Sequence, residues 1–145
     1  MKAWLAVLAL CAASLAPGLA RAQALVDSLA LARQYTTWLY AGEADSLVAH
    51  STDETRNDEG ARDRYVQLSQ LIAQRAGFEL EVSEETWKLR NGECQYWRTA
   101  QFSAMEEPLL IRWVLDRQGR IAGIGAGPYA EAPPVESETC APPAG

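Results

Sequence analysis

The chain has few of the residues that most often build metal and catalytic centres. Its 145 residues include one histidine, His50, and three cysteines. Cys11 lies in an N-terminal apolar run, and Cys94 and Cys140 are far apart, so no zinc-binding spacing exists. No G-x-S-x-G nucleophile elbow is present either. These absences argue against a zinc site and against an elbow-type serine hydrolase, and we expect no cofactor.

Basic charge is also scarce. The 13 lysines and arginines are outnumbered by 19 acidic residues, which gives a formal charge of −6. Removal of residues 1–22, argued below, takes away Lys2 and Arg21 and changes the formal charge to −8. An acidic chain does not favour phosphate backbones or anionic lipid, so we expect no nucleic-acid binding and no membrane-surface binding. With 48% apolar and 22% charged residues, the composition is globular rather than disordered or collagen-like.

Residues 1–22 have the pattern of a secretory leader. A basic residue, Lys2, precedes an apolar run over residues 3–15, and Ala20-Arg21-Ala22 has the small-x-small pattern that a signal peptidase accepts. We expect cleavage before Gln23. The apolar run is too short to span a bilayer as a stable helix, so we expect no permanent membrane anchor.

The alternative to a cleaved leader is a lipoprotein, because Cys11 lies in this region. A lipobox requires a small residue before its cysteine, and Leu10 stands there, which disfavours lipidation. After cleavage the chain has one lysine, Lys88, against ten arginines. This bias is typical of GC-rich bacterial genomes, so we expect a periplasmic or secreted bacterial protein.

Two cysteines remain after cleavage, Cys94 and Cys140. An even pair in an oxidising compartment indicates a disulfide, and the alternative is two free thiols. Because Cys140 lies in the Pro-rich stretch 128–145, the bond would attach this tail to the folded domain.

The first half of the mature chain has helical periodicity. Apolar residues recur three and four positions apart over 24–41, and again over a short segment at 44–50 and a third at 59–76. A glycine follows the first and the third of these helices, where a left-handed cap is favoured. The polar stretch 51–60 between them is predicted to be a loop. The inner stripe of the third helix is expected to be Tyr65, Leu68, Leu71 and Ile72.

From residue 78 the apolar period changes from 3.6 to 2, which indicates strands. Asn91-Gly92 predicts a tight hairpin turn that pairs Leu89 with Cys94, Trp87 with Tyr96, and Glu85 with Arg98. Before this turn the apolar positions switch from even to odd numbers, which one extra residue near 83–85 would explain. We therefore predict a β-bulge there. The residues expected to face the core before the bulge are Phe78, Leu80 and Val82.

Two further strands are predicted at about 108–116 and 120–126, and residues 128–145 are expected to form an extended tail. The predicted fold is α+β, with three N-terminal helices packed on one face of a bent four-stranded antiparallel sheet. The expected organisation is a signal peptide over 1–22, one domain over 23–127, and the tail.

Two segments carry a family resemblance, namely residues 32–47 (ARQYTTWLYAGEADSL) and residues 111–123 (IRWVLDRQGRIAG). They resemble the first helices and the closing strand pair of the nuclear-transport-factor-two-like superfamily, a cone-shaped, cystatin-like α+β fold. The resemblance covers about residues 25–126 and is nearest to small exported bacterial members of unassigned function. Many members have a short strand between the second and third helices, and this sequence shows none. The superfamily includes enzymes and non-catalytic domains, so the resemblance implies the fold and not an activity.

Family enzymes place an ionisable side chain inside the cone, where apolar walls shift its pKa. The ligand-pocket candidates on this basis are Tyr35, Tyr40, His50, Glu85, Tyr96 and Arg98. The Glu85–Arg98 pair would orient a ligand's carboxylate or hydroxyl, and the alternative is a cross-strand salt bridge worth under ~1 kcal/mol. No catalytic residue is assigned, because no catalytic motif matches.

Three further features bear on partners and ligands. Trp97 has the opposite parity to Tyr96, so we expect it on the open face of the sheet, where it is a candidate contact for a homodimer. The acidic stretch 51–60 lacks the glycine and glutamate spacing of an EF-hand, which leaves no metal site. The glycine-rich stretch 123–128 follows a strand and precedes no helix, so it is no nucleotide loop.

The function expected from the sequence is an exported, non-catalytic binding or scaffold domain, whose partner is a small apolar ligand or a protein. The alternative is an isomerase, dehydratase or hydrolase that uses the cone as its active site. A third hypothesis is that residues 131–145 carry the function, by binding a partner as a polyproline segment. A disulfide at Cys140 would weaken that hypothesis.

Overall fold

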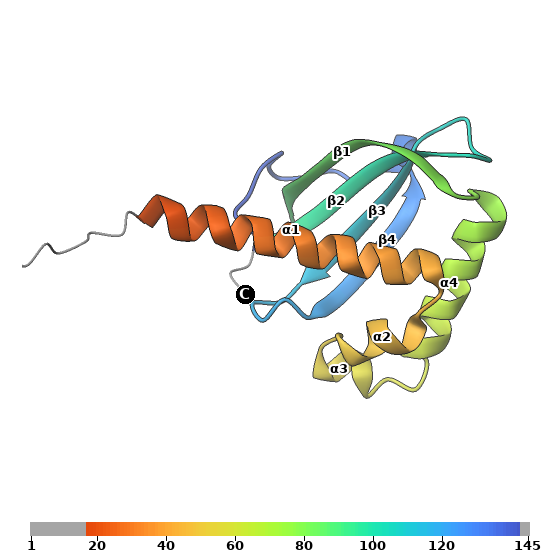
Figure 1. Ribbon diagram of the computed structural model, residues 1–145, viewed down its shortest axis with the longest axis horizontal. Coiled ribbons are helices and arrows are strands. Elements are labelled where there is room, and N and C mark those ends of the chain that lie inside the picture. Colours follow the sequence, from red (N-terminus) through yellow and green to blue (C-terminus); the bar gives the residue numbers. More distant parts are fainter. Residues whose placement is uncertain (1–16, 143–145) are drawn as a thin grey trace, which may run out of the picture.

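The computed structural model describes the backbone of residues 17–142 and the side chains from residue 27 onward. In this part of the chain four helices precede four strands (Figure 1). In chain order the elements are α1 (Pro17–Ala41), α2 (Ala44–Ala49), α3 (Asp53–Arg56), α4 (Ala61–Arg75), β1 (Glu79–Arg90), β2 (Glu93–Phe102), β3 (Leu109–Leu115), β4 (Ile121–Pro128) and a 3-10 turn, η1 (Tyr129–Glu131). The sheet is antiparallel with the order β1-β2-β3-β4, so the α+β class is confirmed.

Most of the expected leader, residues 1–16, lies outside the described residues. Residues 17–22 form the first turns of α1, which therefore begins before the predicted start at residue 24. None of the helices in the described part of the chain is long and apolar enough to cross a membrane. Cleavage before Gln23 stays a prediction.

Helix α1 crosses one face of the sheet (Figure 1). Leu39 and Trp113 of β3 are fully buried between the two layers. The indole Nε1 of Trp113 donates a hydrogen bond of 3.0 Å to Thr36 Oγ1, and the hydroxyl of Tyr35 donates to the Gly119 carbonyl at 2.7 Å. Both polar groups would be costly if they were buried unpaired, so these bonds specify how α1 sits on the sheet. We call the face under α1 the inner face.

The remaining helices differ from the expectation in two details. The stretch 51–60, predicted to be a loop, contains the one-turn helix α3, which is too short to show a periodicity. In α4 the buried residues are Ala61, Tyr65, Ser69 and Ile72. Leu71 is exposed, contrary to the expected inner stripe, because the helix turns its Ser69 side inward. Between α2 and α3, Ser51 forms an isolated parallel bridge with Ile121 in place of a strand.

The predicted hairpin is confirmed in its turn and register. Asn91 and Gly92 have φ values of 54° and 73°, the left-handed pair that a type I′ turn requires. Leu89 pairs with Cys94, Trp87 with Tyr96, and Glu85 with Arg98. The predicted bulge is present too, as a register shift between Val82 and Glu84.

A second register shift, between Glu79 and Glu81, was not predicted. It turns Glu79 inward and leaves Phe78 and Leu80 exposed, with 68% and 59% of their surfaces open to solvent. The expectation that these two apolar residues face the core is therefore wrong. Its cause is the ion pair of Glu79 described below, which determines the facing of the strand start.

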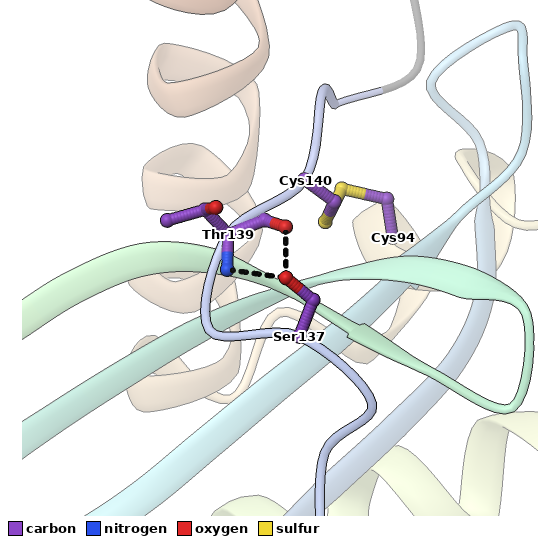
Figure 2. The surroundings of a disulfide bond; sticks show 4 residues. All are labelled: Cys94, Ser137, Thr139 and Cys140. Carbon is purple, nitrogen blue, oxygen red and sulfur yellow. Dashed lines mark hydrogen bonds between the residues drawn. A yellow bond between two sulfur atoms is a disulfide. The ribbon is translucent and has the colours of Figure 1, made fainter.

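After η1 the chain passes over the outer face of the sheet, opposite to α1, and reaches the free edge of β1 (Figures 1 and 2). We call residues 132–140 the strap. There the Leu89 amide donates to the Ser137 carbonyl at 2.9 Å, and the Cys140 amide donates to the Trp87 carbonyl at 3.2 Å. The predicted disulfide between Cys94 and Cys140 is confirmed, with Cα atoms 5.8 Å apart (Figure 2). The strap thus covers the end of β1 around Trp87 and Leu89, part of an otherwise open strand edge.

Replacing Cys140 with serine should release the strap. The disulfide spans 46 residues, so its loss is expected to lower the free energy of unfolding by about 4 kcal/mol in the chain-entropy model. Urea unfolding under non-reducing conditions measures this change. In hydrogen exchange the Leu89 amide should lose protection, whereas the Ile121 amide, bonded to the His50 carbonyl, should serve as the unaffected reference. A change below about 1 kcal/mol, with Leu89 still protected, would show that the strap stays docked without its disulfide.

Candidate functional site

An open groove of about 520 Å³ lies between α1 and the first half of β1. Helix α1 and the strands contribute its lining in nearly equal shares. The lining residues are Arg33, Thr36, Thr37, Tyr40, Glu79, Val82, Glu85 and Arg98. The α1 residues recur at helical spacing, so they form one polar stripe beside the apolar face of that helix.

Arg98 of β2 stands between two carboxylates of β1. Its Nε and Nη2 donate to the two carboxylate oxygens of Glu79 at 3.0 and 2.6 Å, and its Nη1 donates to Glu85 Oε1 at 3.0 Å. The three side chains are only 15–18% exposed. Paired, partly desolvated and bidentate, this triad is stronger than an exposed surface ion pair.

Each carboxylate has further donors. Arg33 donates to Glu85 from Nε, shared between the two carboxylate oxygens at 2.9 and 3.0 Å, and from Nη2 at 2.5 Å, and the Tyr96 hydroxyl donates as well. Glu79 accepts one from the Tyr40 hydroxyl at 2.9 Å. We call these six residues, Arg33, Tyr40, Glu79, Glu85, Tyr96 and Arg98, the groove network. Its two positive and two negative side chains balance.

The groove network holds each group in one charge state at neutral pH. Burial alone would raise the pKa of Glu79 and of Glu85, but the hydrogen bonds from Arg98 and Arg33 respectively, with those from the tyrosines, bring both pKa values below the ordinary range. Burial, and then the neighbouring carboxylates, raise the pKa of Tyr40 and Tyr96. A general acid or base works best with a pKa near the operating pH, and none of these four groups meets that condition.

The structure brings together four of the six sequence candidates: Tyr40, Glu85, Tyr96 and Arg98. Tyr35 is buried elsewhere on α1, and burial raises its pKa to about 12. His50 lies with its ring 4.7 Å from that of Trp38, and its Nδ1 is 2.9 Å from the Ser46 carbonyl oxygen. Neither Tyr35 nor His50 lines the groove.

Sequence reasoning missed Arg33 and Glu79. Arg33 could have been found from its place in the polar stripe of α1, seven residues before Tyr40. Glu79 carries no such signal, because only the second register shift in β1 turns it inward.

Trp97 lies on the outer face, as its parity predicted, but it is only 2% exposed. The Lys88 ammonium lies 5.2 Å and the Arg112 guanidinium 5.6 Å from the centre of its ring. The expectation of an open tryptophan available to a second copy is therefore wrong, because cationic side chains cover it. A homodimer through this face stays a prediction.

A smaller hollow of about 390 Å³ lies between α4 and β4 and is lined by Arg64 and Tyr65 among others. Arg64 pairs with Asp58 at 2.7 Å, and the Tyr65 hydroxyl is 2.9 Å from Ser51 Oγ. Over residues 17–142 no group of three histidine, cysteine or acidic side chains is placed to hold a metal ion. The groove is therefore the better candidate site.

A scan against protein-family models, a search of curated proteins and a search of solved structures each find no match to this chain. The site is therefore interpreted from its own geometry. The likeness to the nuclear-transport-factor-two-like superfamily stays a prediction.

Replacing Arg98 with leucine should leave Glu79 and Glu85 half-buried without their shared guanidinium. We expect the free energy of unfolding at pH 7 to fall by about 2–4 kcal/mol. In the wild type the lowered pKa values of both carboxyls supply stability above the ordinary value of 4.5, and it is lost as the pH falls through the lowered values. In the variant, burial without Arg98 favours the protonated carboxyl of Glu79, whereas Glu85 keeps its bonds from Arg33, so the difference between the two proteins should shrink at pH 4.

Urea unfolding at both pH values measures this effect. The control is Arg62→Leu, which breaks the exposed pair with Asp45 and should cost less than about 1 kcal/mol. Equal losses in the two variants, or a loss for Arg98→Leu that does not change with pH, would contradict the role assigned to the triad.

Proposed function

We propose that the protein is an exported, non-catalytic binding domain of the nuclear-transport-factor-two-like fold, and that its groove binds a small polar molecule without net charge. The observation that carries the proposal is the charge balance of the groove network, in which every ionisable group is paired. A leader-like N-terminus and the disulfide between Cys94 and Cys140 support export to an oxidising compartment.

The polar lining favours a hydroxylated ligand over the apolar one that the sequence predicted. An arginine side chain has five N–H donors, and the network bonds leave part of this capacity of Arg33 and Arg98 unused. Glu79 accepts three hydrogen bonds and keeps acceptor capacity, whereas Glu85 is already filled by donors from Arg33, Tyr96 and Arg98. A hydroxyl group both donates and accepts, so it matches such a surface, whereas an anion or a cation would compete with a partner already in place. Val82 and the ring of Tyr40 supply the apolar contact.

The two alternatives have less support. An isomerase, dehydratase or hydrolase works best with a group that exchanges a proton near neutral pH, and the pKa values of the groove network are shifted away from neutrality. Binding through a free polyproline tail is weakened, since Cys140 is bonded to Cys94 and the strap is hydrogen-bonded to β1.

Filling the groove should abolish binding. Val82 faces the groove and Leu80, two residues earlier, faces solvent, so Val82→Trp and Leu80→Trp are matched variants of one strand. Native mass spectrometry of protein exported to a bacterial periplasm should detect a small neutral molecule on the wild type and on Leu80→Trp. We expect none on Val82→Trp. A wild type without bound mass, or a mass that survives Val82→Trp, would contradict binding in the groove.

A further inference from the structure

The outer face of the sheet carries an arginine held entirely by neutral groups. The guanidinium of Arg112 lies 5.6 Å from the ring centre of Trp97, and its Nη1 donates to Gln95 Oε1 at 3.2 Å. On its other side it lies over Gly125, its partner in β4, where a Cβ atom would come within 2.4 Å of Nη2. A ring, an amide and a glycine backbone thus fix the position of this cation.

No carboxylate of the described residues lies within ion-pair distance of Arg112. Burial lowers the pKa of its guanidinium, and the nearby Arg90 lowers it further. Half-buried arginines are normally neutralised, as Arg98 is on the inner face by two carboxylates. The positive charge of Arg112 is therefore destabilising without a counter-charge beside it.

Arg90 is likewise a partly buried cation without a paired carboxylate. Its Nε is buried and finds no hydrogen-bond partner among the described residues. Glu93 lies opposite to it in the hairpin register but is exposed and forms no ion pair with it within the described structure. The third cation of this face, Lys88, is neutralised by Glu84 at 3.1 Å and by Glu138 of the strap at 2.7 Å. Two arginines on one face thus remain without a counter-charge.

We propose that the outer sheet face between Arg112 and Arg90 binds a small free oxyanion of the phosphate or sulfate class. A guanidinium offers planar, paired N–H donors that match the oxygens of such an anion, and stacking against Trp97 and Gly125 pre-organises them. The strap crosses this face, so the site suits a small ion rather than an anionic macromolecule (Figure 1). The site lies on the opposite face from the groove and does not depend on the function proposed above.

Isothermal titration of the disulfide-bonded protein with inorganic phosphate, against sodium chloride of equal ionic strength, tests the proposal. Wild-type protein should bind one phosphate saturably. Arg112→Gln should weaken the dissociation constant at least tenfold, and Arg90→Gln should weaken it as well. Arg117→Gln removes the same charge from an exposed turn and should leave it within twofold.

A second variant separates charge from position. Gly125→Ala keeps both arginines, but its Cβ would displace the Arg112 guanidinium, so it should also lose phosphate binding. Circular dichroism and thermal unfolding in chloride confirm that each variant is folded, and Arg112→Gln should be no less stable than wild type there. Absence of saturable phosphate binding, equal weakening by Arg117→Gln, or full binding by Gly125→Ala would overturn the proposal.

Discussion

The half-buried guanidinium of Arg98 requires negative charge, and the shape of β1 follows from how that requirement is met. Glu79 and Glu85 lie six residues apart on one strand, yet both contact the same arginine. Two register shifts between them, at Glu79/Glu81 and at Val82/Glu84, set the six-residue interval of β1 against only four residues of β2, from Arg98 to Phe102, which brings both carboxylates within reach of one arginine. The exposed positions of Phe78 and Leu80 are a consequence: their burial, worth about 1.5–3 kcal/mol each, is given up where a desolvated charge is paired.

The two faces of the sheet differ in whether their arginines are neutralised by carboxylates. On the inner face each arginine of the groove network has a carboxylate, and the site balances to no net charge. On the outer face Arg112 has a tryptophan ring, an amide and a glycine, and among the described residues Lys88 is the cation of this face that carboxylates neutralise. Arginine thus has its charge neutralised on the inner face and lacks a counter-charge on the outer face. This contrast is the basis of both proposals, a neutral ligand for the groove and an anion for the outer face.

The sequence predicted those features that depend on neighbours along the chain. Asn91-Gly92 determines a turn, and the turn determines the register that places Glu85 opposite Arg98. The parity switch predicted the first shift in β1, and the cysteine count predicted the disulfide. What it could not supply depends on contacts between distant elements. The inward turn of Glu79 is determined by Arg98 and Tyr40, and the cover over Trp97 by Lys88 and Arg112.

The strap links the disulfide to the outer face. Cys140 is held at Cys94, which packs against the core, and two residues earlier Glu138 pairs with the Lys88 ammonium that lies over Trp97. Without the disulfide, Lys88 would keep Glu84 but lose the partner that the strap presents. The face would then lose one negative charge, because Glu84 alone would balance the Lys88 ammonium. Oxidation of the two cysteines therefore also determines whether the Glu138 carboxylate lies on the face that carries Arg90 and Arg112.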